Sequence, residues 1–182
     1  MFGCSPERLF QVVSSSPSSN GEYSSDKTTR VVSEALAGTR PRGSTPQADQ
    51  ELSRQLFASA KDQSENKITG RFITEAFDEL IERGVGTMKG RYYVRRLRHL
   101  QHICQQFQFQ LSSSAVVKDV IRHLLTALHP TPAVGGYPKD PALDFIRQHE
   151  SIAFDRGYYA GPVGFVGREE AEIVVAIRSG LI

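Results

Sequence analysis

The sequence of 182 residues contains no tryptophan and only two cysteines, Cys4 and Cys104. Two cysteines so far apart lack metal-ligand spacing and cannot build a disulfide framework, so they favour a reduced, cytosolic protein. Long hydrophobic runs are also missing, because no apolar stretch approaches the roughly 20 residues that cross a bilayer. The N-terminus does not have the charged-then-apolar order of a signal peptide. We therefore expect no association with a membrane.

An excess of charge of one sign is lacking too. The chain has 22 basic and 20 acidic residues, a formal net charge of +2. The one basic cluster, RYYVRRLRH at 91–99, alternates with apolar residues, which is more typical of a solvated element edge than of a nucleic-acid site. We expect no nucleic-acid partner.

The apolar share of 39% can support a core. Strands are expected at 8–13 and 30–36, joined as a hairpin by the Ser-rich segment 14–29, which carries no recognisable chemistry. Core-type residues begin at position 2, and AEIVVAIRSGLI stops within strand-like sequence. We interpret residues 1–182 as part of a larger domain, with strands missing at both ends.

Hydrophobic periodicity predicts the remaining elements. Residues 37–47, AGTRPRGSTPQ, are rich in Gly, Pro and Arg and predict an irregular loop. Residues 91–111 mix β-branched, aromatic and Gln residues and favour strand. YYAGPVGFV with EIVVAIRSGLI predicts a C-terminal β-hairpin, in which Pro162 limits its strand to an edge, a bulge or an end. Helices are expected at 48–60, 62–83, 115–127 and 139–149. This mixture is typical of an α+β fold.

A few residues could carry chemistry. The small residues of AGTR at 37–40 allow backbone N–H groups to approach an anion, although a plain turn fits equally well. Arg178, within an apolar strand, would need an anionic partner from a ligand or from the protein. Tyr159 could face a ligand or fill the core, and Glu65 could bind a metal or simply be solvated. None of the pairs among His99, His102, His123, His129 and His149 has convincing zinc spacing, and no phosphate-binding loop or nucleophilic triad is evident.

The most constrained stretch is LHPTPAVGGYPKDP at 128–141, with four prolines and two glycines. Proline fixes φ and removes a donor, whereas glycine allows conformations that other residues do not tolerate, so this segment predicts one irregular shape between two helices. Together with FGCSPERLF, SEALAGTRPRG, AKDQSEN, LRHLQHI, FDRGYYAGPVGF and VAIRSGL, it resembles the chorismate-utilising enzymes in motif order and rough spacing. The resemblance covers nearly the whole chain except the Ser-rich segment, and it implies their α+β chorismate-binding fold.

Within that family, HPTPAVGG resembles the isochorismate synthases, which use magnesium to add water at C2 of chorismate and expel the C4 hydroxyl. The resemblance implies that Glu7, in SPERL, is the general acid and that Glu65 is a magnesium ligand. It further implies that Gly38, Thr39, His99, Tyr159 and Arg178 line the substrate site. An arginine suits the substrate's carboxylate because its planar guanidinium forms paired hydrogen bonds.

The sequence also departs from the family. Asn66 stands where the family usually has a histidine. The family's general base is a lysine on a strand preceding SPE, and no lysine of the chain matches it: Lys27, Lys61, Lys67, Lys89, Lys118 or Lys139. The glutamates that complete the magnesium site should follow a Gly-Ala-Gly-Ile motif after position 182. We therefore expect a companion chain to supply these groups, or else inactivity.

Alternative functions stay open: a non-catalytic remnant or split-gene piece, or another chorismate-converting enzyme such as salicylate or anthranilate synthase. The expected location is the cytoplasm, or a plastid in a photosynthetic eukaryote.

Overall fold

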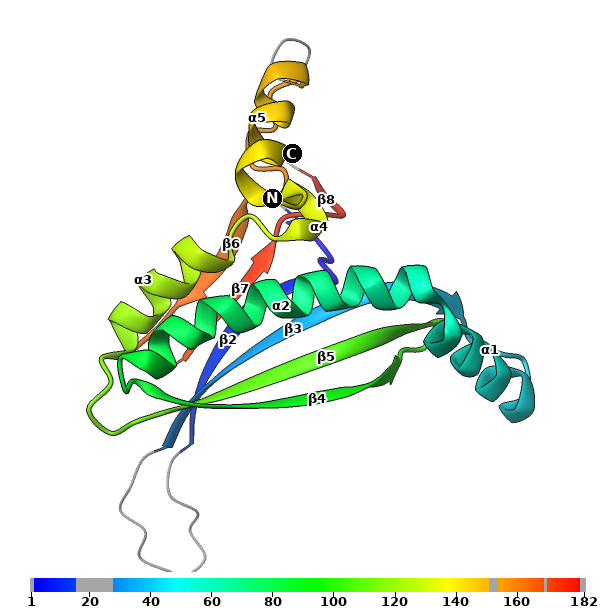
Figure 1. Cartoon of the computed structure of the whole chain (residues 1–182), viewed down its shortest axis with the longest axis horizontal. Coiled ribbons are helices and arrows are strands. Elements are labelled where there is room, and N and C mark those ends of the chain that lie inside the picture. The colour runs from blue at the N-terminus through cyan, green and yellow to red at the C-terminus, as the bar shows by residue number, and fades with distance from the viewer. Residues whose placement is uncertain (1, 16–27, 151–153, 169, 181–182) are drawn as a thin grey trace, which may run out of the picture.

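The fold is built on one antiparallel sheet, as the computed structural model shows for residues 2–15, 28–150, 154–168 and 170–180 (Figure 1). The strand order is β4-β5-β3-β2-β7-β6, and β1 pairs separately with β8. The bounds are β1 (Phe2–Gly3), β2 (Arg8–Ser15), β3 (Thr28–Pro41), β4 (Gly86–Arg96), β5 (Leu100–Leu111), β6 (Pro162–Val166), β7 (Glu170–Val175) and β8 (Ser179–Gly180). The α+β prediction is confirmed.

The helices are α1 (Pro46–Ala58), α2 (Ala60–Glu82), α3 (Val117–Leu128), α4 (Pro132–Gly135) and α5 (Lys139–His149). The four helices expected from periodicity all exist, with ends within two residues of the expected bounds. The additional α4 is a single turn inside the Pro- and Gly-rich segment. Within the described residues no helix is long and apolar enough to cross a membrane.

The core forms where α2 lies across one face of the sheet, with α3 beside it (Figure 1). Phe77 of α2 stacks on Phe109 of β5 with ring centroids 5.1 Å apart. Both rings are fully buried, and burial of one such side chain stabilises the fold by about 1.5–3 kcal/mol. At the other end of α2, the buried amide of Asn66 donates to the backbone oxygens of Ala35 and Ile103 at 3.0 and 3.3 Å. The helix is therefore bound to the sheet by apolar packing and by hydrogen bonds.

Strand β3 corrects the expectation of an irregular loop for residues 37–41, whereas residues 42–45 are irregular as expected and α1 begins at Pro46. The strand pairs with β5 as far as Pro41, and a register shift between Ala37 and Thr39 absorbs Gly38 as a bulge. Gly38 has φ +68°, and a Cβ at this position would lie 2.7 Å from the Cβ of Asp62 on α2. Glycine is required here because of both the left-handed backbone and the close approach. The strand pairing, not the local composition, decided the conformation of this segment.

The strand prediction for residues 91–111 is confirmed, and the structure divides this stretch into two strands of a hairpin, a division that was not predicted. Strand β4 ends at Arg96 and β5 begins at Leu100, and the Leu97 amide donates to the Leu100 carbonyl across the turn at 2.8 Å. The turn contains neither Gly nor Pro, so nothing in its composition marked it.

The β2–β3 hairpin is confirmed, because Gln11–Ser15 pair with Thr28–Val32. Residues 16–27 of the Ser-rich connection lie outside the described part of the chain. Pro162 begins β6, an edge strand, as expected from its missing N–H.

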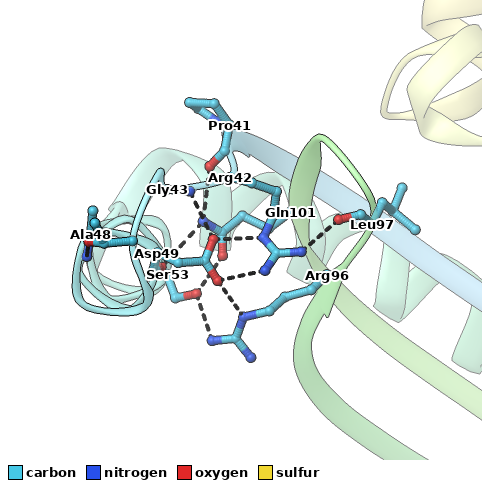
Figure 2. A network of polar contacts seen from close by, with 10 residues as sticks. Pro41, Arg42, Gly43, Ala48, Asp49, Ser53, Arg96, Leu97 and Gln101 are labelled. Atoms are coloured by element: carbon cyan, nitrogen blue, oxygen red, sulfur yellow. Dashed lines mark hydrogen bonds and ion pairs between the residues drawn. The ribbon is translucent and has the colours of Figure 1, made fainter.

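A polar network around Asp49 fastens α1 to the end of the sheet (Figure 2). Both carboxylate oxygens of Asp49 accept hydrogen bonds from Arg42, at 2.6 and 3.0 Å. One of them also accepts from Arg96 on β4 at 3.1 Å. Arg42 in turn donates to the Leu97 carbonyl from its side chain at 2.7 Å and to the His99 carbonyl from its backbone at 3.0 Å. Asp49 therefore holds the turn between β4 and β5 in place.

Replacement of Asp49 tests this network. Hydrogen bonds from Arg42 and from the Gly43 amide lower the pKa of Asp49 from 3.8 to about 2. A lowered pKa stabilises the fold above pH 3.8, and this contribution is lost as pH falls toward 2. We expect Asp49→Asn to lower the melting temperature at pH 7 and the difference to shrink below about pH 4. The exposed Glu51→Gln on the same helix is the control and should change stability less; an Asp49→Asn deficit independent of pH would contradict the prediction.

Candidate active site

Glu7 lies immediately before β2, at the end of the sheet where the Pro- and Gly-rich segment approaches. Its backbone oxygen accepts a hydrogen bond from the Val175 amide at 3.0 Å, which continues the pairing of β2 with β7. Its carboxylate Oε1 accepts the hydroxyl of Thr131 at 2.6 Å. Thr131 is 5% exposed, so this contact is largely shielded from water. The motifs SPERL and HPTPA, far apart in the sequence, meet here.

The cleft at Glu7 contains two carboxyl groups whose pKa values are shifted in opposite directions. Its lining includes Glu7 and Thr131, Glu34 and Leu36 of β3, and Thr69 of α2. Burial raises the pKa of Glu7 above its ordinary value of 4.5, although Thr131 and His129 oppose the rise. Burial acts likewise on Glu34, but hydrogen bonds from Arg95 and Gln106 outweigh it and lower that pKa. Carboxyl groups whose pKa values are pushed apart assume different roles: Glu7 can carry a proton, whereas Glu34 stays ionised in its ion pair with Arg95.

The same segment joins Glu7 to the turn that carries Tyr159. His129 contacts the Ala160 carbonyl through Nε2 at 2.8 Å. The Tyr159 amide donates to the Arg156 carbonyl at 2.7 Å within this turn, and the Tyr159 side chain is 52% exposed. Of the two alternatives for Tyr159, the structure excludes core packing and leaves its ring available to a ligand.

Arg178 corrects a prediction. It does not lie inside an apolar strand, since β7 ends at Val175 and Arg178 has φ +51° in the segment before β8. Its side chain is exposed and, within the described residues, forms no hydrogen bond or ion pair. Its carbonyl accepts the Cys4 amide at 3.2 Å, which places Arg178 beside the segment that leads to Glu7. The guanidinium is therefore free to meet an anion in solution.

A second group of predicted residues gathers at the β3 bulge. Thr39 is exposed, and its hydroxyl lies 3.1 Å from Nδ1 of His102 on β5. The Gly38 carbonyl is 3.3 Å from the same nitrogen. Arg40, next along β3, pairs with Asp62 of α2 at 3.0 Å. His102 has no metal-ligand spacing to the other histidines, and the pairing of β3 with β5 brings it to Thr39.

His99 and Glu65 lie on neighbouring segments without touching that group. His99 is exposed in the β4–β5 turn, where its backbone accepts the Arg42 amide. Glu65 is on α2 with its side chain 53% exposed, and its carboxylate is 3.8 Å from the Lys61 ammonium. One helical turn further along α2, Thr69 lines the Glu7 cleft. The structure thus brings Glu7, Tyr159 and Arg178 to one end of the sheet, and Gly38 and Thr39 to the end of β3.

The whole chain, residues 1–182, matches the family model described as chorismate binding enzyme. This chain belongs to the chorismate-binding enzyme family.

The named relatives of this family member are longer. It is 42% identical over 180 residues to "Isochorismate synthase 2, chloroplastic" of Arabidopsis thaliana, covering 99% of this chain and 28% of the relative. It is 38% identical to "Salicylate biosynthesis isochorismate synthase" of Pseudomonas aeruginosa, covering 99% and 33%. The solved structure of MenF, the menaquinone-specific isochorismate synthase from Escherichia coli, superposes with a TM-score of 0.71 at 29% identity, covering 97% and 36%. The chain thus spans about a third of these proteins.

The metal site predicted for this family member has one candidate ligand in the described residues. No three His, Cys, Asp or Glu side chains there are grouped to hold an ion. Magnesium binds proteins through one or two carboxylates and takes its other ligands from water and substrate oxygens. The exposed carboxylate of Glu65 fits such a role as a single ligand.

Sequence reasoning missed Thr131 and His102 as site residues. Thr131 is part of the HPTPA motif, so its position in that motif was the sequence feature that could have indicated a site residue. For His102 the available sequence feature was its position three residues after His99, a spacing that does not suit a metal site but does not exclude another role. Asp49 gave no signal, because an aspartate early in a helix is ordinary.

The pH dependence of stability tests the environment of Glu7. Because burial raises its pKa, Glu7 favours the folded state below pH 4.5, and stability falls as pH rises through the folded pKa. Gln at this position is neutral and can still accept the Thr131 hydroxyl. We expect Glu7→Gln to melt above the wild type at pH 8, with the gain fading toward pH 4. Thermal melts across this range check it, with the exposed Glu75→Gln as control; a gain that is equal at every pH would refute the assigned environment.

Proposed function

We propose that this chain forms the general-acid side of an isochorismate synthase site. The observation that carries the proposal is the Glu7 carboxyl, which is half buried, has a raised pKa and, among the described residues, accepts a hydrogen bond on Oε1 but none on Oε2. A general acid at neutral pH needs such a raised pKa, because it must hold a proton until the leaving group takes it. The names of the 42% and 38% identical relatives support the choice of reaction.

In the proposed reaction, water forms a C–O bond at C2 of chorismate, the ring double bonds shift, and the C4–O bond breaks. Glu7 gives its proton to the departing C4 hydroxyl, which leaves as water. The attacking water loses a proton to a base, so the product is an isomer of the substrate. The resemblance assigns that base to a lysine without a counterpart in this chain, and we propose that a companion polypeptide segment supplies it.

Substrate binding is proposed to depend on attraction between the Arg178 guanidinium and a carboxylate of the substrate. Chorismate carries two carboxylates, and the exposed Arg178 guanidinium can bind one of them through two parallel hydrogen bonds. Tyr159 lies in the turn that His129 anchors, so its hydroxyl can contribute to the same carboxylate. Gly38, Thr39 and His99 are proposed to line the remaining surface.

Magnesium would be held by the Glu65 carboxylate and would neutralise a substrate carboxylate when bound. Glu65 is the described residue that fits this role, and the ammonium of Lys61 at 3.8 Å would have to give way to the ion.

The binding proposal is tested with the purified chain and chorismate by isothermal titration calorimetry. Arg178→Met should weaken binding by about ten- to a hundredfold, because a hydrogen bond to a charged group contributes about 1.5–3 kcal/mol. Arg168→Met is the matched control, since Arg168 is an exposed arginine outside the proposed site. No binding by the wild type, or equal loss in both variants, would overturn the proposal and favour a non-catalytic remnant.

An assay of product formation distinguishes the remaining alternatives, namely isochorismate synthase activity, the activity of another chorismate-converting enzyme, and inactivity. Incubated with chorismate and magnesium, the 182 residues alone should release no product, because the proposed base is absent from them. Chromatography of the mixture checks this. The appearance of isochorismate would contradict the need for a companion segment, and salicylate or anthranilate would replace the proposed reaction with that of another chorismate-converting enzyme.

A further inference from the structure

Two threonines of this chain occupy the same local position but use their hydroxyls differently. Thr45 precedes Pro46 at the start of α1, and Thr131 precedes Pro132 at the start of α4. Both are N-cap residues with extended backbone. The Thr45 hydroxyl accepts from the Ala48 amide at 3.2 Å, which is the ordinary role of an N-cap threonine. The Thr131 hydroxyl makes no cap hydrogen bond and donates to Oε1 of Glu7 instead.

The backbone around Thr131 is held in place by other contacts. Its carbonyl accepts the amides of Val134 and Gly135 at 3.1 and 2.8 Å. Two residues earlier, the His129 carbonyl accepts the Lys139 ammonium at 2.8 Å, and the His129 ring is bound to Ala160. The hydroxyl therefore reaches Glu7 from a backbone that is fixed on both sides.

The two oxygens of Glu7 are consequently not equivalent. An ionised carboxylate only accepts hydrogen bonds, whereas a protonated carboxyl has one O–H and one carbonyl oxygen. Oε1 already accepts the Thr131 hydroxyl. Oε2 has no hydrogen-bond partner among the described residues, yet it is not a sealed polar atom, since the only fully buried side-chain atom without a partner there is Oδ1 of Asn66. An Oε1 that still accepts the Thr131 hydroxyl when Glu7 binds a proton takes the carbonyl role, which leaves the proton to Oε2.

We propose that Thr131 is a positioning residue that makes Oε2 of Glu7 the oxygen that carries and delivers the proton. The inference builds on the proposed function in that it treats Glu7 as the acid, but its physical content concerns the carboxyl alone. Without the hydroxyl, either oxygen can be protonated, and the carboxyl can rotate about its terminal bond. With it, the proton is confined to Oε2, the oxygen that Thr131 does not contact.

Other charged groups around Glu7 act alongside Thr131. Glu34 and Arg8 line the same cleft, where Glu34 is paired with Arg95 and Arg8 with Glu172. His129 and Lys139 lie on the Pro- and Gly-rich side. Substitution of Thr131 leaves all of these charges in place, so a change in the Glu7 titration on substitution reports the hydroxyl itself.

The experiment is a carbon-13 NMR titration of the Glu7 carboxyl in the isolated chain. Thr131→Val should raise the pKa of Glu7 by about one pH unit, because a hydrogen bond that favours the carboxylate is lost. Thr131→Ser keeps a hydroxyl and should stay near the wild type. Thr45→Val removes the cap of α1 and should leave the Glu7 pKa unchanged. A Thr131→Val chain that is folded by circular dichroism and titrates like the wild type would overturn the proposal, as would equal shifts in Val and Ser.

A second measurement needs no substitution at Thr131. In the wild type, above the pKa of Glu7, the Thr131 hydroxyl proton should exchange slowly enough with water to be observed by NMR. A rapidly exchanging proton would overturn the proposal even if Thr131→Val does not fold. Neither of these two measurements involves chorismate. If calorimetry shows no binding of chorismate while Thr131→Val shifts the pKa of Glu7, the proposed function is wrong but the role of Thr131 is supported.

Discussion

The packing of α2 across the sheet is the contact on which the rest of the structure depends. Phe77 on Phe109 supplies its apolar part, and the amide of Asn66 supplies a polar part by bonding to the backbone of β3 and β5. The buried Asn66 Nδ2 keeps its two hydrogen bonds to the backbone of β3 and β5 only at one placement of the helix, so Asn66 limits where α2 can lie along the sheet. That placement determines the position of Glu65 and brings Thr69 to the cleft of Glu7.

Around this apolar framework, the candidate site is assembled by polar contacts at the strand ends. Asp49 accepts hydrogen bonds from Arg42 and Arg96. Arg42 in turn binds the carbonyl of His99, so this network holds the turn between β4 and β5. Thr131 reaches Glu7 across 124 positions of sequence. Loops carry binding groups well when a rigid sheet positions them. Here Arg42 and Asp49 hold the β4–β5 turn, and Thr131 joins the Pro- and Gly-rich segment to Glu7. Arg178 and Tyr159 are left exposed, as the proposed contact with a ligand requires.

Local pattern was a good guide to the helices and a poor one to the chain reversals. The apolar faces of α1, α2, α3 and α5 recur at helical spacing, so the four helices could be predicted. The turn after Arg96 has no Gly or Pro, and its flanking strands continue the same mixture of Arg, aromatic and apolar residues. The tail IVVAIRSG looked like one strand because its apolar residues are continuous, although strand pairing ends at Val175. The positions of turns and strand ends depend on hydrogen-bonding partners in distant segments, which the local sequence does not reveal.

The sequence by itself determined the chemistry that is available: a carboxyl at Glu7, an arginine at position 178, a rigid segment at 128–141, and motifs whose order indicated the family. Only the tertiary structure decided which of these groups meet. It showed that Thr131 diverts its hydroxyl from its own helix to Glu7, that Glu34 keeps its charge while Glu7 can take a proton, and that Arg178 faces solvent. The physical reason is that hydrogen bonding and burial depend on neighbours supplied by distant segments, whereas a sequence records only the identity of each side chain.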